Sequence, residues 1–127
     1  MHFQIDNSSK RPVYQQIIDQ VRRDIALGRL KKGEKLPTVR QLASVLLINP
    51  NTIARAYRQL EQESIIVTKP GSGAFVAELN SNLSGAVRKK IIFRQLELLV
   101  VDAVQMRIDK RTMTDWFNQT LDRFKIA

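Results

Sequence analysis

The chain has 127 residues and 43% of them are hydrophobic, which is enough for an ordinary domain with a packed core and argues against wholesale disorder. Its formal net charge of +9 favours polyanionic partners, nucleic acid ahead of an anionic membrane surface. The absence of cysteine and the single histidine exclude a disulfide framework, a thiol nucleophile and a credible cysteine or histidine metal site, so we expect no metal and no cofactor.

The first predicted helix begins near Pro12 and ends near Gly28. Proline fits the first turn of a helix, where its missing N–H is not needed, and glycine suits the residue that follows a helix. Between them the apolar side chains recur at helical spacing and form one face: Tyr14, Ile17, Ile18, Val21 and Ile25. This pattern indicates an amphipathic helix that packs one side against a core.

A second and a third helix follow, separated by a tight turn. Thr38, with Gln41 three residues later, forms a capping box directly after Pro37, and Asn49 caps the next helix with Pro50 at its first position. The expected buried stripes are Val39, Leu42, Ala43 and Leu46 in the second helix, and Ile53, Ala56, Tyr57 and Leu60 in the third.

Residues 65–69 and 74–77 are mostly β-branched or apolar and flank a Lys-Pro-Gly-Ser-Gly turn, so they predict a hairpin. A helix, a turn, a second helix and a basic hairpin, in that order, are typical of a winged helix-turn-helix. Such a domain places one helix in the major groove of duplex DNA and reaches along the backbone with its hairpin.

The outward face of the third helix carries Asn51, Thr52, Arg55 and Arg58. Arginine reads guanine and asparagine reads adenine through paired hydrogen bonds, which makes these side chains candidates for base contacts. In the hairpin, Lys69 beside glycines suits a close approach to the sugar-phosphate backbone. The alternative is that these residues are an ordinary solvated helix face and an ordinary turn.

The second part of the chain predicts a helical tail. We expect a DNA-binding domain over residues 1–77, a polar linker over 78–85 and a helical dimerisation domain over 86–127, with Thr112 or Thr114 capping the last helix. The two tail helices are too short and too apolar to bury their surface alone, so we expect them to pair with a second chain. The expected dimer interface is Ile92, Leu96, Leu99, Ala103, Met106, Met113, Trp116, Phe117, Leu121 and Phe124. Folding back on the first domain in a monomer, or forming a small-molecule pocket around Trp116 and Phe117, are the alternatives.

Four motifs carry a family resemblance over about the first 77 residues: Pro12–Val13–Tyr14, Leu36–Pro37–Thr38–Val39–Arg40–Gln41–Leu42–Ala43, Asn49–Pro50–Asn51–Thr52–Ile53 and Gly71–Ser72–Gly73–Ala74–Phe75–Val76. In order and spacing they resemble the DNA-binding domain of the GntR family of bacterial transcription regulators, most closely its YtrA subfamily. The resemblance implies DNA contacts from the regions of Thr38 and Arg40, from Asn49, Asn51 and Thr52, and from Gly71. Four positions differ from the family pattern, because many relatives have arginine in the places of Pro50 and Ala54, and glycine is common in the places of Leu47 and Ser64.

The resemblance also implies a repressor, often of transport operons, and the tail is too short for a substantial ligand cavity. We therefore expect a cytoplasmic, homodimeric, sequence-specific repressor of an inverted-repeat operator, with no membrane association. A small-molecule effector is left open. A non-specific nucleic-acid-binding or architectural protein is the main alternative, and a protein-binding adaptor is another. No nucleophile–base pair or phosphate-binding glycine loop is present, so we do not expect an enzyme.

Overall fold

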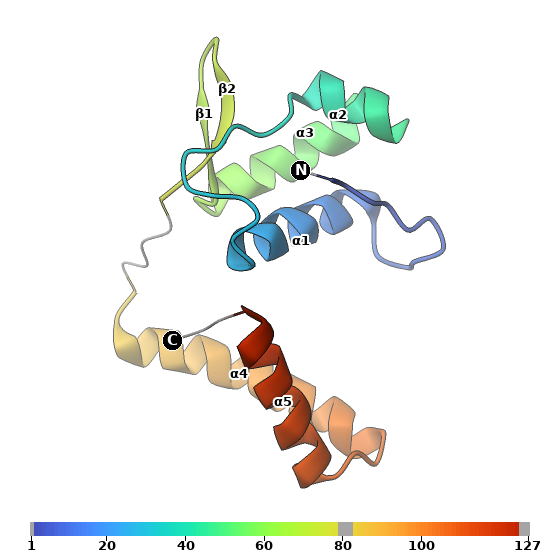
Figure 1. Ribbon diagram of the computed structural model, residues 1–127, viewed down its shortest axis with the longest axis vertical. Coiled ribbons are helices and arrows are strands. Elements are labelled where there is room, and N and C mark those ends of the chain that lie inside the picture. Colours follow the sequence, from blue (N-terminus) through green and yellow to red (C-terminus); the bar gives the residue numbers. More distant parts are fainter. Residues whose placement is uncertain (1, 79–82, 125–127) are drawn as a thin grey trace. The chain divides into compact units, whose positions relative to one another are not determined.

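The computed structural model describes residues 2–78 and 83–124, which contain five helices and one two-stranded hairpin (Figure 1). In chain order the elements are α1 Val13–Ala26, α2 Val39–Leu46, α3 Pro50–Gln62, β1 Ile66–Lys69, β2 Gly73–Val76, α4 Gly85–Gln105 and α5 Lys110–Phe124. The expected fold, mainly α with a small hairpin, is confirmed. The chain forms two compact units, Met1–Leu79 and Asn80–Ala127, and each is described by itself.

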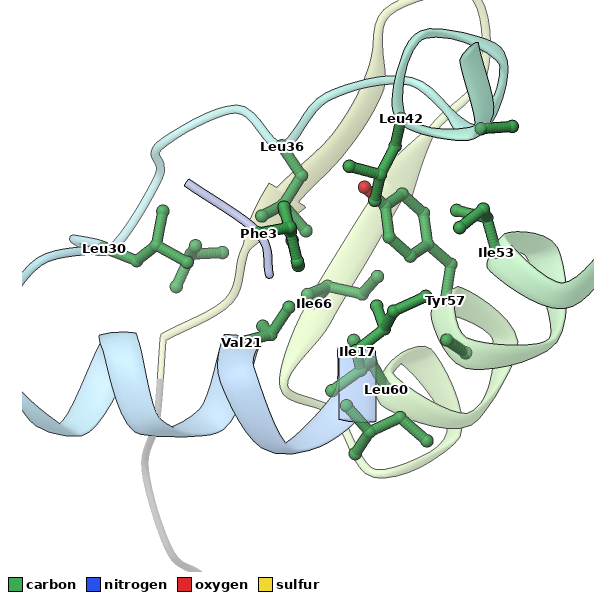
Figure 2. Packing of buried hydrophobic residues seen from close by; sticks show 14 residues of the cluster. Phe3, Ile17, Val21, Leu30, Leu36, Leu42, Ile53, Tyr57, Leu60 and Ile66 are labelled. Carbon is green, nitrogen blue, oxygen red and sulfur yellow. The ribbon is translucent and has the colours of Figure 1, made fainter. Parts of the chain in front are cut away.

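The core of the first unit lies between α1 and α3, and α2 and the hairpin close it (Figure 2). Ile17, Ile18 and Val21 of α1 are fully buried, as are Ile53 and Leu60 of α3. Burying side chains of this size contributes roughly 1.5–3 kcal/mol each. The predicted apolar stripes are confirmed at their centres, whereas the side chains at their margins are only half-buried: Tyr14, Ile25, Val39 and Leu46.

The N-terminal segment also belongs to this core. Phe3 packs into it with 9% of its surface exposed (Figure 2). Two glutamines of α1 hold the segment in place, because Gln20 Oε1 accepts from the Gln4 N–H and Gln16 Oε1 from the Asp6 N–H, both at 2.9 Å. The segment has no periodic pattern that would indicate this packing, and its sequence alone predicts only a frayed end.

The helix ends follow the predicted capping chemistry. The Thr38 hydroxyl accepts from the Gln41 N–H at 3.1 Å, and the Gln41 side chain accepts from the Thr38 N–H at 3.0 Å, so the capping box is complete. Asn49 Oδ1 accepts from the Asn51 N–H at 2.9 Å and starts α3. Leu47 ends α2 in the left-handed region with φ +55°, a conformation that favours glycine over leucine.

The hairpin pairs Ile66 with Val76 and Lys69 with Gly73 in antiparallel register. Each strand is one residue off the expected range, because β1 begins one residue later and β2 lies one residue earlier. A further segment runs along β2: the Leu36 N–H donates to the Ala74 carbonyl and the Val76 N–H to the Glu34 carbonyl, each at 2.9 Å. The sequence indicated only a turn over this segment, which in fact braces the hairpin against the core.

In the second unit, α4 begins at Gly85, one residue before the expected start of the helical domain. α5 begins at Lys110, before both of the threonines that were expected to cap it. Ser84 caps α4, so Ser84 and Gly85 of the expected linker belong to the start of this helix. Residues 79–82 of that expected linker lie outside the described residues. Asp109 starts α5, because its carboxylate accepts from the Thr112 N–H at 2.7 Å. The expected capping by Thr112 or Thr114 is therefore wrong, and the same hydrogen bond holds the pKa of Asp109 below its ordinary value.

Candidate nucleic-acid interface

The first half of α3 presents its polar side chains on one side. Asn51, Arg55 and Arg58 are exposed and follow one another at steps of four and three, which places them on one face of the helix. That face is opposite the buried stripe of Ile53 and Leu60. Thr52 lies at its edge and is half-buried. The structure therefore brings three of the predicted base-contacting residues together on one helical surface.

Arg55 has a partner that the sequence pattern did not predict. Its guanidinium carbon lies 3.8 Å from the centre of the Tyr14 ring, at the start of α1. A guanidinium stacked on a tyrosine face is attracted by the electron density of the ring and loses much of its rotational freedom. Tyr14 thus holds Arg55 at the edge of the α3 face nearest α1. The only signal for it in the sequence is a tyrosine within an otherwise aliphatic stripe.

Arg58 lies on the other side, beside the hairpin. It lines an open groove of about 300 Å³ between the start of α2, α3 and the hairpin, together with Thr38 and Gly73. Two hydrogen bonds fix the walls of this groove. The Thr68 hydroxyl of β1 donates to the Glu61 carboxylate of α3. The Tyr57 hydroxyl donates to the Pro37 carbonyl at 2.7 Å.

The Tyr57 bond joins α3 to the chain that leads into α2, and Figure 2 shows the Tyr57 ring within the core. Burial raises the pKa of Tyr57, so the phenol stays neutral and remains a donor. α3, the chain that leads into α2 and the hairpin are therefore held to one another. A rigid arrangement of this kind is what specific contacts to a duplex need.

On α2, Arg40 is the second residue of the helix and is exposed. Thr38, just before the helix, uses its hydroxyl oxygen to accept the Gln41 N–H, so its first role is to cap the helix. Asn49 has the corresponding role at the start of α3. The structure thus gives Thr38 and Asn49 structural functions that are compatible with, but separate from, a contact to DNA.

The hairpin tip carries Lys69 and Gly71, neither of which lines the groove beside Arg58. Lys69 is exposed, with its Nζ 4.9 Å from the centre of the Phe75 ring. Gly71 has φ +78° and open space where a side chain would be, so the backbone of the turn is bare. Lys35, which no motif in the sequence singled out, lies across β2 with its Cε 3.0 Å from the position a Cβ on Gly73 would occupy. Lys35 adds a further positive charge to the hairpin.

The cations of this surface are open to an external partner. Within residues 2–78 and 83–124, no carboxylate forms an ion pair with Arg40, Arg55, Arg58 or Lys69. A surface of unpaired cations on a rigid helix and hairpin is suited to the phosphates and base edges of DNA.

In the second unit, α5 lies beside the C-terminal half of α4, whose Ala103 is buried with 5% of its surface exposed. Two apolar grooves of about 410 and 440 Å³ are formed by α4 and α5, and Leu99, Met113 and Phe117 line both. Of the residues expected at a dimer interface, Leu96, Met113, Leu121 and Phe124 are half-buried, and Ile92, Leu99, Met106, Trp116 and Phe117 are exposed. None of the helices in the described part of the chain combines the length and apolarity needed to cross a membrane.

A capped helix, a tight turn, a second capped helix and a basic hairpin define the first unit as a winged helix-turn-helix DNA-binding domain. Residues 13–76 match the family of bacterial regulatory proteins named gntR. The chain belongs to the GntR family and resembles its YtrA subfamily, and it is a transcriptional regulator with a DNA-binding domain.

Two sets of relatives support this membership. The chain is 36% identical to the HTH-type transcriptional repressor YtrA of Bacillus subtilis, over 91% of this chain and 89% of that protein. A structure from Listeria monocytogenes described as a transcriptional antiterminator matches with a TM-score of 0.85 at 27% identity, over 100% of this chain and 95% of that one. YtrA from Sulfolobus acidocaldarius, a GntR-family transcription factor, matches with a TM-score of 0.59 at 40% identity, over 75% of this chain and 97% of that one.

Proposed function

We propose that this protein is a homodimeric repressor that binds an inverted-repeat operator through α3 and the hairpin of each chain. The observation that carries the proposal is the α3 face of Asn51, Arg55 and Arg58, exposed, unpaired with carboxylates of the described residues and held in place by a rigid domain. In this proposal Arg40 contacts nearby phosphates, and the hairpin around Lys69 and Gly71 follows the adjacent backbone. Binding across a promoter would exclude polymerase.

The tail supports a dimer. The middle of α4, residues 91–104, is apolar on most sides, and α5 covers only one of them. Ile92, Val104 and Met106 are 57%, 68% and 71% exposed in the single chain, which is a costly state for large apolar side chains. A second copy of the tail offers the same apolar surface, and pairing would place the two recognition helices about a two-fold axis.

The target is proposed by resemblance. Because the YtrA subfamily generally represses transport operons, and because the matched Bacillus relative is itself named a repressor, we propose repression of a transporter operon. The experiment is selection of bound fragments from random duplex DNA at about 0.15 M salt, where specific and non-specific binding separate. Recovery of an inverted repeat, with half-sites spaced by about 34 Å or a multiple of it, would support the proposal. Tight binding at low salt with no recovered motif would instead support a non-specific nucleic-acid-binding protein.

The dimer is tested separately by sedimentation of the whole chain. Ile92→Glu places a charge on an exposed apolar position that lines neither tail groove, so it leaves the α4–α5 contact intact. We expect this variant to sediment as a monomer and to lose operator affinity. Asn118→Glu introduces the same charge at an exposed polar position of α5 and is the matched control, which we expect to remain a dimer. A monomeric wild-type protein would contradict the proposal.

A further inference from the structure

Every charged residue in the first half of α4 is positive. Arg88, Lys89, Lys90 and Arg94 are all exposed, and the sequence contains no carboxylate between Glu78 and Glu97. Within the described residues none of the four forms an ion pair. Lys89 has an internal contact, since its Nζ lies 5.5 Å from the centre of the Phe93 ring, whereas Arg88, Lys90 and Arg94 make no such contact there. The three are therefore free to meet a partner outside the described chain.

This arrangement is unfavourable for the isolated helix. The N-terminus of a helix carries partial positive charge, so cations in its first turns are destabilising and anions are favoured. Lys90 and Arg94 are also four residues apart and repel each other as neighbours on one side of the helix. Ordinary solvated helix faces mix both signs of charge. A single-sign segment at a helix N-terminus is better explained by an external polyanion that offsets the repulsion.

Duplex DNA is the polyanion that the chain itself brings near. Nine Cα steps separate Val76, at the end of the hairpin, from Gly85, at the start of α4, and a chain of that length spans at most about 30 Å. A turn of duplex is about 34 Å long and is lined with phosphates on both strands. From Gly85 to Arg94 the helix adds about 14 Å. Once the hairpin is on DNA, the covalent chain therefore keeps the basic segment within about 45 Å of the base of the hairpin, which is less than one and a half turns of duplex.

We propose that Arg88, Lys90 and Arg94, supported by Lys89, form a second DNA contact that binds the phosphates flanking each half-site. This inference rests on the proposed function, because it requires the first unit to be bound to DNA. The contact reads no sequence, since phosphates are the same everywhere. It adds affinity, salt dependence and a preference for duplexes that extend beyond the operator.

The test compares two full-length variants with equal reductions in positive charge. One carries Arg88→Gln, Lys90→Gln and Arg94→Gln. The control carries Lys110→Gln, Arg111→Gln and Arg123→Gln, three exposed cations of α5. Binding is measured from about 0.05 to 0.2 M salt on the selected operator with short and with extended flanks, and on random duplex. Removing one phosphate-binding cation from the interface lowers the slope of log affinity against log salt by about 0.9.

We expect the α4 variant to show a slope that is shallower by at least about 2 per dimer, to bind operator and random DNA more weakly by the same factor, and to gain nothing from extended flanks. The control is expected to keep the wild-type flank dependence, and both variants are expected to remain dimers by sedimentation. An unchanged slope in the α4 variant, or an equal change in the control, would overturn the inference.

Binding to vesicles that contain phosphatidylglycerol tests whether the basic segment binds an anionic membrane surface in place of DNA. Loss of vesicle binding in the α4 variant with an unchanged DNA slope would assign the segment to a membrane surface and also overturn the inference. If the wild-type protein selects no operator, the proposed function fails by itself. If it selects one and the α4 variant matches the wild type at every flank length, only the inference fails.

Discussion

Removal of the Tyr14 ring is expected to weaken operator binding through Arg55, although Tyr14 itself need not touch DNA. The ring stands half-buried at the start of α1, with the Arg55 guanidinium 3.8 Å from its centre. Arginine loses considerable rotamer freedom when it binds, and a side chain already held by stacking loses less on binding DNA. Tyr14→Leu removes the stack, whereas Tyr14→Phe keeps the aromatic face and loses only the hydroxyl.

The magnitude follows from the geometry of an exposed stack. Such a cation–π contact is worth about 0.5–1 kcal/mol, which corresponds to about a two- to five-fold change in affinity for each half-site. A dimer on two half-sites doubles the free energy, so Tyr14→Leu is expected to weaken operator binding about five- to 25-fold. Tyr14→Phe is expected to change it less than about two-fold, since a phenyl ring still accepts the cation.

The assay is fluorescence anisotropy of labelled operator, run as a double-mutant cycle with Arg55→Ala. Thermal melts of each variant check that the domain remains folded, because Tyr14 also packs against the core. In the Arg55→Ala background, Tyr14→Leu is expected to have little further effect. The same loss with and without Arg55 would show that Tyr14 acts through packing alone. Tighter binding by Tyr14→Leu would show that the ring holds Arg55 away from DNA, and either result would refute the reasoning.

Three substitutions test the contacts that hold α2, α3 and the hairpin together. Leu47→Gly is expected to raise the free energy of unfolding by about 0.5–1 kcal/mol in urea melts, because it relieves a φ of +55° at a side chain that is largely exposed; a decrease would contradict this. Tyr57→Phe is expected to lower the free energy of unfolding by about 1–2 kcal/mol, since the Pro37 carbonyl loses the hydroxyl that donates to it at 2.7 Å. Burial raises the pKa of Tyr57 above its ordinary value of 10.0, so the wild-type stability from this group is present below that pH and is lost as the pH rises above it; the variant is expected to lose less stability there. Gly73→Ala is expected to lower stability by about 1–2 kcal/mol, because the residue has φ +116° and its Cβ would stand 3.0 Å from Lys35; unchanged melting would count against this reading of the hairpin.

The elements that the sequence predicted well are those whose signals are local. Thr38 with Gln41, and Asn49 with Pro50, fix where α2 and α3 begin through bonds to residues two or three positions away. Helical periodicity then identified the buried side chains of α1 and α3 at their centres. Capping and periodicity depend on neighbours in the chain, so a single sequence is enough to read them.

The contacts that the sequence did not predict join residues far apart in the chain. The segment over Glu34 to Leu36 is too short to show an alternating pattern, so the sequence did not predict its hydrogen bonds to β2. The Tyr14 stack on Arg55 depends on how α1 crosses α3. The start of α5 was misplaced for a different reason, since the positive charges of Lys110 and Arg111 resemble a polar break and are unfavourable in the first turn of a helix.

The two proposals for the tail are thermodynamically linked, because both lie on α4. Its middle is apolar beyond what α5 covers, and its first half carries unopposed positive charge. If the tails pair, each dimer gains two basic segments related by the same two-fold axis as the two recognition helices. DNA that binds both segments then favours the dimer over the monomer, and the dimer in turn favours DNA with flanks on both sides. Loss of pairing should therefore reduce the flank dependence to that of a single half-site, because a monomer brings one basic segment to the duplex in place of two.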